Sequence, residues 1–201
     1  MAKSTSSVLK RTEETLYTAK LGLNGLSSAD PRERMAGLRN LVVFGRAVTN
    51  VLQNLRTIEP EFEEWYSSYV QEMLENPLMK YFYKLRSEIL KQGTVRIGIA
   101  MNFSGNPFEL ARRSPPPPGA KSFFIGDEIG GSGWEVELPD GTKTKYYVTI
   151  PSDLANFELD IKLHFSGAPG DLQDVPIEEL CASYIGYLEN MLADARRRFR
   201  S

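Results

Sequence analysis

The hydrophobic pattern of this chain changes its period at Gly93, and that change limits the folds it can adopt. Before Gly93, apolar residues recur every three or four positions, which is the spacing of amphipathic helices. From Val95 onward apolar and polar residues alternate, as in half-buried strands, and helical spacing returns near Asp174. Such strands suit an antiparallel sheet packed on one face. The order predicts an α+β fold: an antiparallel helical bundle with a small antiparallel β-sheet inserted before the last helix.

Three helix starts can be located before Gly93. At Asp30-Pro31-Arg32-Glu33 a capping aspartate precedes proline at the first helical position and an acid in the first turn, so a helix is expected to about Thr57. Pro60 and Asn76-Pro77 begin two further helices, and Gly93 is expected to cap the last of them. The helix from residue 30 is apolar on two sides, which is typical of a central position in a bundle.

The domain organisation follows from these elements. Residues 1–29 are expected to be only partly ordered, with a short helix at Leu9–Lys20 and helix breakers at Gly22 and Gly25. The bundle comprises residues 30–93 and 174–200, and residues 94–173 form the β-rich insertion.

The insertion is expected to contain two amphipathic strands and a hairpin. Residues 95–103 and 157–165 alternate in polarity, and residues 134–138 and 143–150 flank the turn Pro139-Asp140-Gly141. Residues 112–119, RRSPPPPG, form a stiff connector with a proline-rich loop at 114–119, because consecutive prolines favour polyproline II.

Composition excludes several classes of function. The formal net charge is −2, so any nucleic-acid contact must come from a local basic patch. His164 and the single Cys181 lack the partners of a zinc site, and Gly130–Gly133 is not followed by the lysine of a phosphate loop, so no metal or cofactor is expected. The chain has no signal-peptide pattern and no apolar run near 18 residues, so we expect a cytoplasmic protein with no membrane segment.

A narrow polar line runs along the helix that begins at residue 30. At about 100° per residue, its members fall within roughly 40° of one another; they are Arg39, Arg46, Asn50, Gln53 and Thr57. Two interpretations stay open: a solvated outer face, or the lining of a cleft to which Arg39, Arg46 and Asn50 contribute.

The segment Tyr81–Gly93, YFYKLRSEILKQG, carries the most specific motif. It resembles the motif of the HEPN superfamily, small helical-bundle proteins in which arginine is followed by a polar residue and, a few positions later, by histidine. Arg86 corresponds to the arginine and Ser87 to the polar residue, whereas Lys91 stands in place of the histidine. The resemblance covers the helical part of the chain.

The resemblance implies a homodimer in which two such motifs face each other across a cleft. Catalytic members of the superfamily cleave RNA without metal, using the histidine and the arginine. The reference pKa of lysine is about 10.4 against about 6.5 for histidine, so freeing Lys91 to act as a base at pH 7 would cost about 4–5 kcal/mol. A charged lysine still binds phosphate. Alternatively, Arg86 pairs with Glu88 or another glutamate and Lys91 merely lies at a helix end.

Three functions therefore stay open. The first is a HEPN-like homodimer that binds an acidic ligand, RNA or a nucleotide, between Arg86, Lys91 and Arg46 without efficient catalysis. The second is a metal-independent ribonuclease of a toxin or phage-defence system, which would have an antitoxin-like protein partner. The third is a structural or protein-interaction module that docks through the sheet or the proline run.

Overall fold

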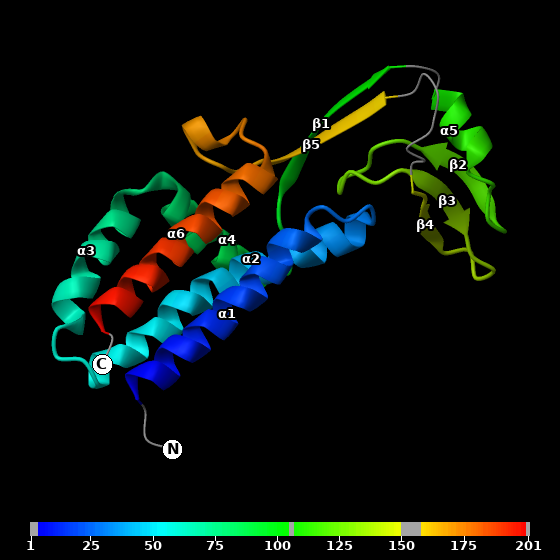
Figure 1. The fold of residues 1–201 in the computed structure, drawn as a ribbon. Helices are drawn as coiled ribbons and strands as arrows, with labels where there is room; N and C mark the ends of the chain where they lie inside the picture. Colours follow the sequence, from blue (N-terminus) through cyan, green and yellow to red (C-terminus); the bar gives the residue numbers. More distant parts are fainter. Residues whose placement is uncertain (1–3, 105–106, 150–157, 200–201) are drawn as a thin grey trace.

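The structure, a computed structural model, describes residues 4–104, 107–149 and 158–199. Within these ranges five long helices lie along one another at one end of the molecule (Figure 1): α1 (Thr5–Gly25), α2 (Pro31–Leu52), α3 (Phe62–Glu75), α4 (Pro77–Gln92) and α6 (Ile177–Arg198). The 3-10 helix η1 (Gln53–Thr57) continues α2, and η2 (Gly170–Leu172) precedes α6.

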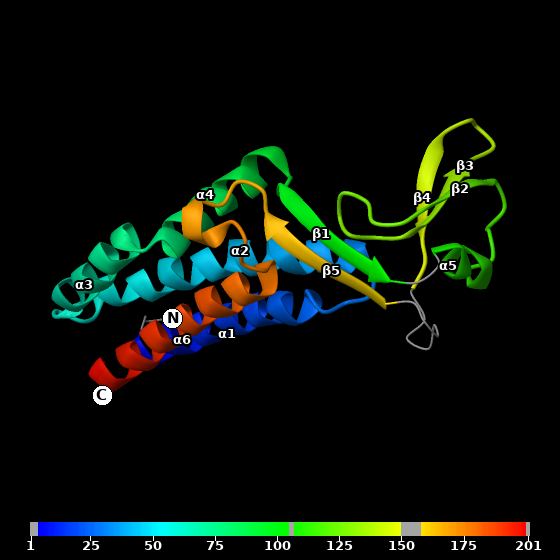
Figure 2. The same ribbon diagram turned by 90° about the horizontal axis from the view of Figure 1, so that it is seen from above.

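The strands lead away from these helices. A ribbon of β1 (Ile97–Ser104) and β5 (Glu158–Phe165) connects them to a second unit, which we call the β-subdomain. It contains α5 (Pro107–Arg113), β2 (Ala120–Phe124), β3 (Gly133–Glu137) and β4 (Lys143–Tyr147) and lies at the far end of the ribbon (Figure 2). The fold is mixed α+β with small antiparallel sheets.

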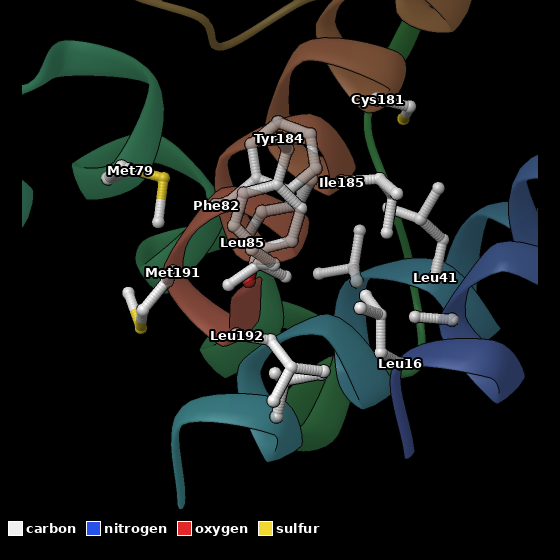
Figure 3. Packing of buried hydrophobic residues seen from close by; sticks show 14 of the residues in the cluster. Leu16, Leu41, Met79, Phe82, Leu85, Cys181, Tyr184, Ile185, Met191 and Leu192 are labelled. Carbon is white, nitrogen blue, oxygen red and sulfur yellow. The ribbon is translucent and has the colours of Figure 1, made fainter. Parts of the chain in front are cut away.

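The hydrophobic core lies among the five long helices. Phe82 of α4, Tyr184 of α6 and Leu41 of α2 meet there (Figure 3). Phe165, at the end of β5, is fully buried, and its ring packs edge-on against Phe82 with centroids 6.0 Å apart. The last residue of the ribbon is therefore part of the helical core.

The predicted starts of α2 and α4 and the predicted end of α4 are confirmed, whereas α3 begins at Phe62, two residues after the expected Pro60. The Asp30 carboxylate accepts a hydrogen bond from the Arg32 amide at 2.7 Å, and Asn76 caps α4 through the amides of Leu78 and Met79. Gly93 ends α4 with a φ of 68°, a left-handed conformation that favours glycine.

Helix α1 is longer than the expected Leu9–Lys20, because it includes both supposed breakers, Gly22 and Gly25. The reason is the close crossing of α1 and α2. A Cβ added to Gly22 would lie 2.6 Å from the Gly37 carbonyl oxygen, and one added to Gly25 would lie 3.2 Å from the Gly37 Cα. These glycines allow backbone to pack on backbone, a role that sequence does not distinguish from helix breaking.

The described strands form two antiparallel sheets instead of the single sheet expected. β1 pairs with β5, from Ile97 opposite Phe165 onward, while β2, β3 and β4 form a separate three-stranded sheet. Alternation in sequence identifies a strand but not its partner. The short elements α5 and β2 have no counterpart among the predicted elements, so the proline-rich connector begins at Ser114. The predicted strand ends at Ile150 and Phe157, and Arg200 of the last helix, lie outside the described residues.

The β-subdomain packs against the first turn of α2. The Arg32 guanidinium lies 5.2 Å from the centre of the Tyr147 ring, and Arg34 donates to the carbonyls of Ile129 and Gly130 at 3.3 and 3.1 Å. The loop that presents these carbonyls is organised by Asp127. Burial raises the pKa of Asp127, but donors from Tyr147, Lys145 and the backbone outweigh it and hold the pKa below its usual value.

We predict that Gly22→Ala destabilises the protein by about 1–3 kcal/mol, because the new methyl group would overlap the backbone of α2. The measurement is the free energy of chemical unfolding. The matched control is Gly186→Ala in α6, where an added Cβ meets nothing within 4 Å. This control should leave stability unchanged or raise it by up to about 1 kcal/mol. Equal effects of the two substitutions would contradict the close α1–α2 crossing.

We predict that Asp127→Asn destabilises the protein by about 1–3 kcal/mol near neutral pH, because it weakens a network around a side chain that is only 4% exposed. Since folding lowers the pKa of Asp127, its stabilisation is present above the unfolded value of about 3.9 and is lost as pH falls through the lower folded value. The difference in unfolding free energy between wild type and variant should therefore shrink in acid.

The control for this prediction is Glu128→Gln, because Glu128 binds the same lysine, Lys145, at 2.6 Å but is 74% exposed. Its substitution should change stability far less. A difference between wild type and Asp127→Asn that stays constant from pH 7 to pH 3 would show that the charge of Asp127 does not matter.

Candidate functional site

A hollow of about 510 Å³ opens between α2, η1, α3 and α4, with one residue of α6 also in its wall. Its size falls in the range of small-molecule sites. The lining side chains are Arg46, Thr49, Gln53, Arg56, Tyr66, Val70, Met73, Leu74, Met79, Lys80, Tyr83 and Tyr184.

The walls of the hollow are mainly apolar and aromatic. Val70, Met73 and Leu74 contribute from α3, while Met79 and Tyr83 contribute from α4. Leu74 is 61% exposed and Tyr83 is 60% exposed, so the apolar lining continues outward to the surface. Exposed apolar side chains gathered at the mouth of a hollow are a feature of binding sites.

The α3 wall is held in place by Asp194 of α6. This carboxylate accepts hydrogen bonds from the Trp65 indole at 2.7 Å and from the Tyr69 hydroxyl at 2.9 Å. The Trp65 bond is the main reason why the pKa of Asp194 lies below its usual value. The residues of α3 that face the hollow are therefore positioned by a charged anchor on a neighbouring face of the same helix.

Three cations join the apolar lining. The Arg46 guanidinium lies 5.6 Å from the centre of the Tyr83 ring and donates to the Thr49 hydroxyl. Arg56 pairs with Glu63. Lys80 forms no ion pair with a described carboxylate. Arg46 and Lys80 thus face the hollow without a described counter-ion.

Positive charge is in excess on α2, η1 and α4, three of the elements that form the hollow. Residues 34–57 contain four arginines and no acid, and α4 contains four cations and one acid, Glu88. Besides Arg32 and Arg34, which contact the β-subdomain, five cations on these helices form no ion pair with a described carboxylate: Arg39, Arg46, Lys80, Arg86 and Lys91. The chain as a whole has a net charge of −2, so this excess of positive charge is local to these helices.

Of the predicted residues on α2, one lies in the hollow. Arg46 lines it together with Gln53 from the same polar line. Arg39 and Asn50 are exposed and do not line it. The polar line is therefore partly a solvated face and partly the lining of a cleft.

The residues of the α4 motif do not line this hollow. Arg86 is half-buried, and its Nε atom is enclosed without a hydrogen-bond partner. The Ser87 hydroxyl donates to the Tyr83 carbonyl at 3.2 Å, and Lys91 is exposed. Glu88 pairs with Lys84 at 3.7 Å, so it does not neutralise Arg86.

Sequence reasoning missed several residues of the hollow, among them Arg56, Lys80 and Tyr83. These residues belong to η1 and to two turns of α4, and no single periodic pattern contains them. Lys80 and Tyr83 follow Asn76-Pro77 closely. The one available signal was therefore the predicted helix start, which places both residues in the first turns of α4. What it could not reveal is that α3 and α2 lie on either side.

Comparison with known proteins gives one partial match. Residues 26–100 are similar to the family of the bacteriophage lambda protein Ea47, which is less than half of the chain. This stretch includes α2, α3 and α4, and all the residues that line the hollow except Tyr184. No curated protein and no solved structure matched the chain.

Two further observations concern the described part of the chain. Each of its helices is too short or too polar to cross a membrane. Its histidine, cysteine and acidic residues form no group that could hold a metal ion.

Proposed function

We propose that the protein binds an acidic ligand of the nucleotide type, free or at the end of an RNA, in the hollow between α2, α3 and α4. The observation that carries this proposal is the presence of two cations without described counter-ions, Arg46 and Lys80, in a cavity with aromatic and apolar walls. The proposed role is binding without efficient catalysis.

The composition of the hollow matches the two halves of a nucleotide. Guanidinium and ammonium groups bind phosphate oxygens through charge-assisted hydrogen bonds. An exposed tyrosine such as Tyr83 offers a face on which a base can stack, and each such contact is worth about 1–3 kcal/mol. Arg46 already lies over this ring, so a stacked base would approach from the free side.

The assembly we propose is the HEPN-like homodimer implied by the motif on α4. The support is the order of the helical elements and the presence of Arg86 and Lys91 on α4, the helix that also contributes Lys80 and Tyr83 to the hollow. In such a dimer, the phosphates of an RNA chain extending out of the hollow would meet the cations of α4.

We predict that wild-type protein binds adenosine 5′-monophosphate and that Arg46→Ala weakens this binding at least about tenfold, since a charged hydrogen bond contributes about 1.5–3 kcal/mol. Isothermal titration calorimetry gives the affinities. The affinity should also fall as salt concentration rises, because the interaction is electrostatic.

The matched control for Arg46→Ala is Arg39→Ala. Arg39 is two turns away on the same helix, forms no ion pair with a described carboxylate and lies outside the hollow. Its substitution should change the affinity by less than about threefold. If the two variants bind equally well, the hollow is not the site.

A ribonuclease is the second candidate, and one observation favours it. The Nε atom of Arg86 is enclosed without a partner, an arrangement that calls for an unseen acceptor such as a phosphate oxygen. Under this alternative the protein cleaves single-stranded RNA without added metal, and Arg86→Ala abolishes cleavage. Lys91→His should raise the rate, because histidine titrates near working pH. Equal rates for wild type and Arg86→Ala would assign any cleavage to a contaminant.

A further inference from the structure

The hydroxyl of Tyr184 is an unused polar group in the wall of the hollow. Tyr184 comes from α6 and is only 3% exposed, yet it lines the hollow. Its hydroxyl has no hydrogen-bond partner among the described residues, but it is not one of the fully enclosed polar atoms. It therefore retains access to open space, and the hollow is the open space that Tyr184 lines.

The ring of Tyr184 is fixed on both sides. It stacks on the ring of Phe82 (Figure 3). The two centroids are 4.2 Å apart and the interplanar angle is 20°. On the other side the Tyr184 ring approaches Gly45 of α2, where an added Cβ would lie 2.4 Å from the ring. The hydroxyl is thus a rigid donor, which is the kind of group that gives a site its specificity.

Arg46 and Tyr184 both line the hollow, and the charge of Arg46 acts on the Tyr184 hydroxyl. Burial raises the pKa of Tyr184, and the Arg46 charge acts on it in the opposite direction. The hydroxyl therefore stays protonated at neutral pH and can donate. The Thr49 hydroxyl is already engaged with Arg46. It accepts a hydrogen bond from the Arg46 guanidinium and donates one to the Arg46 carbonyl at 3.0 Å.

We propose that Arg46 and the Tyr184 hydroxyl together bind a terminal phosphate at the inner end of the hollow, so that a nucleotide enters phosphate first and its base rests at the rim against Tyr83. This inference rests on the function proposed above and names the class of ligand: a phosphate monoester, and not the diester linkage within a chain.

The geometry explains this preference. Thr49 and Tyr184 are the most buried residues of the lining, at 1% and 3% exposed, and they mark the inner end of the hollow. A chain that continued beyond a phosphate at that end would run into the protein interior. The outer end is open and apolar, with Leu74 and Tyr83 largely exposed. A monoester also carries more negative charge than a diester, which suits a site with two cations that lack described counter-ions.

The experiment compares three probes by calorimetry: adenosine 5′-monophosphate, adenosine, and the dinucleoside monophosphate ApA, whose phosphate is a diester. We expect the monophosphate to bind at least about tenfold more tightly than either of the others. Tyr184→Phe keeps the ring and its stacking, so it should fold. It should weaken monophosphate binding about tenfold and leave adenosine binding unchanged.

The matched control is Tyr66→Phe, which removes a hydroxyl from the same hollow. The Tyr66 hydroxyl already accepts a hydrogen bond from Gln53 at 3.3 Å, so its loss should affect the monophosphate and adenosine alike. Thermal unfolding of both variants verifies that they are folded.

The outcomes separate this inference from the proposed function. If ApA binds as tightly as the monophosphate, or if Tyr184→Phe leaves monophosphate binding unchanged while Arg46→Ala weakens it, phosphate-first entry is wrong and the proposed function stands. If wild type binds none of the three probes nor a short RNA, both are wrong. If Tyr184→Phe does not fold, the comparison of the three probes on wild type still decides the matter.

Discussion

The burial of α2 on several sides is the constraint on which the rest of the structure depends. Its backbone crosses α1 at Gly37, its side chains pack against α4 and α6 in the common core, and its first turn receives the β-subdomain through Arg32 and Arg34. Only one narrow face is left for polar residues, and part of that face opens into the hollow. A residue such as Arg46 is consequently held in a fixed position by the packing of everything around it, which is the preorganisation that a binding site needs.

The cations of α2 and α4 have few acidic neighbours on their own helices, an arrangement that stability alone would not favour. Like charges on neighbouring helices repel, and a surface helix usually relieves this repulsion with acids at i±3 or i±4. Residues 34–57 contain no acid, and on α4 the single acid, Glu88, pairs with Lys84 instead of Arg86. An anionic ligand would supply the missing negative charge. The hollow differs from the other positively charged parts of these helices because it also has aromatic and apolar walls.

Sequence predicted the helical elements well because their signals are local. Asp30, Asn76 and Gly93 act through hydrogen bonds and backbone conformation within one turn, so their residue types suffice. Strand pairing and the hollow depend on contacts between distant segments, and there the predictions were incomplete. Arg46 was found because it breaks an apolar pattern on its own helix. Lys80 and Tyr83 break no pattern, and their proximity to Arg46 exists only once α2 and α4 pack together. The prediction that Gly22 and Gly25 break the helix was wrong for the same reason, since their role in the α1–α2 crossing depends on a distant segment.

The β-rich insertion does not disturb the packing of the helices around the hollow, because its first and last strands pair with each other. β1 is the first element after α4, β5 is the last strand before η2 and α6, and the two strands pair from Ile97 opposite Phe165. The insertion therefore leaves the helices and returns to them at the same place, and α6 can pack as though the two helices were joined by a short loop. That return is needed for the site, since α6 supplies both Tyr184 in the wall of the hollow and Asp194, which holds α3. The part of the chain that resembles the Ea47 family ends within β1, so the hollow is completed by a helix from beyond it.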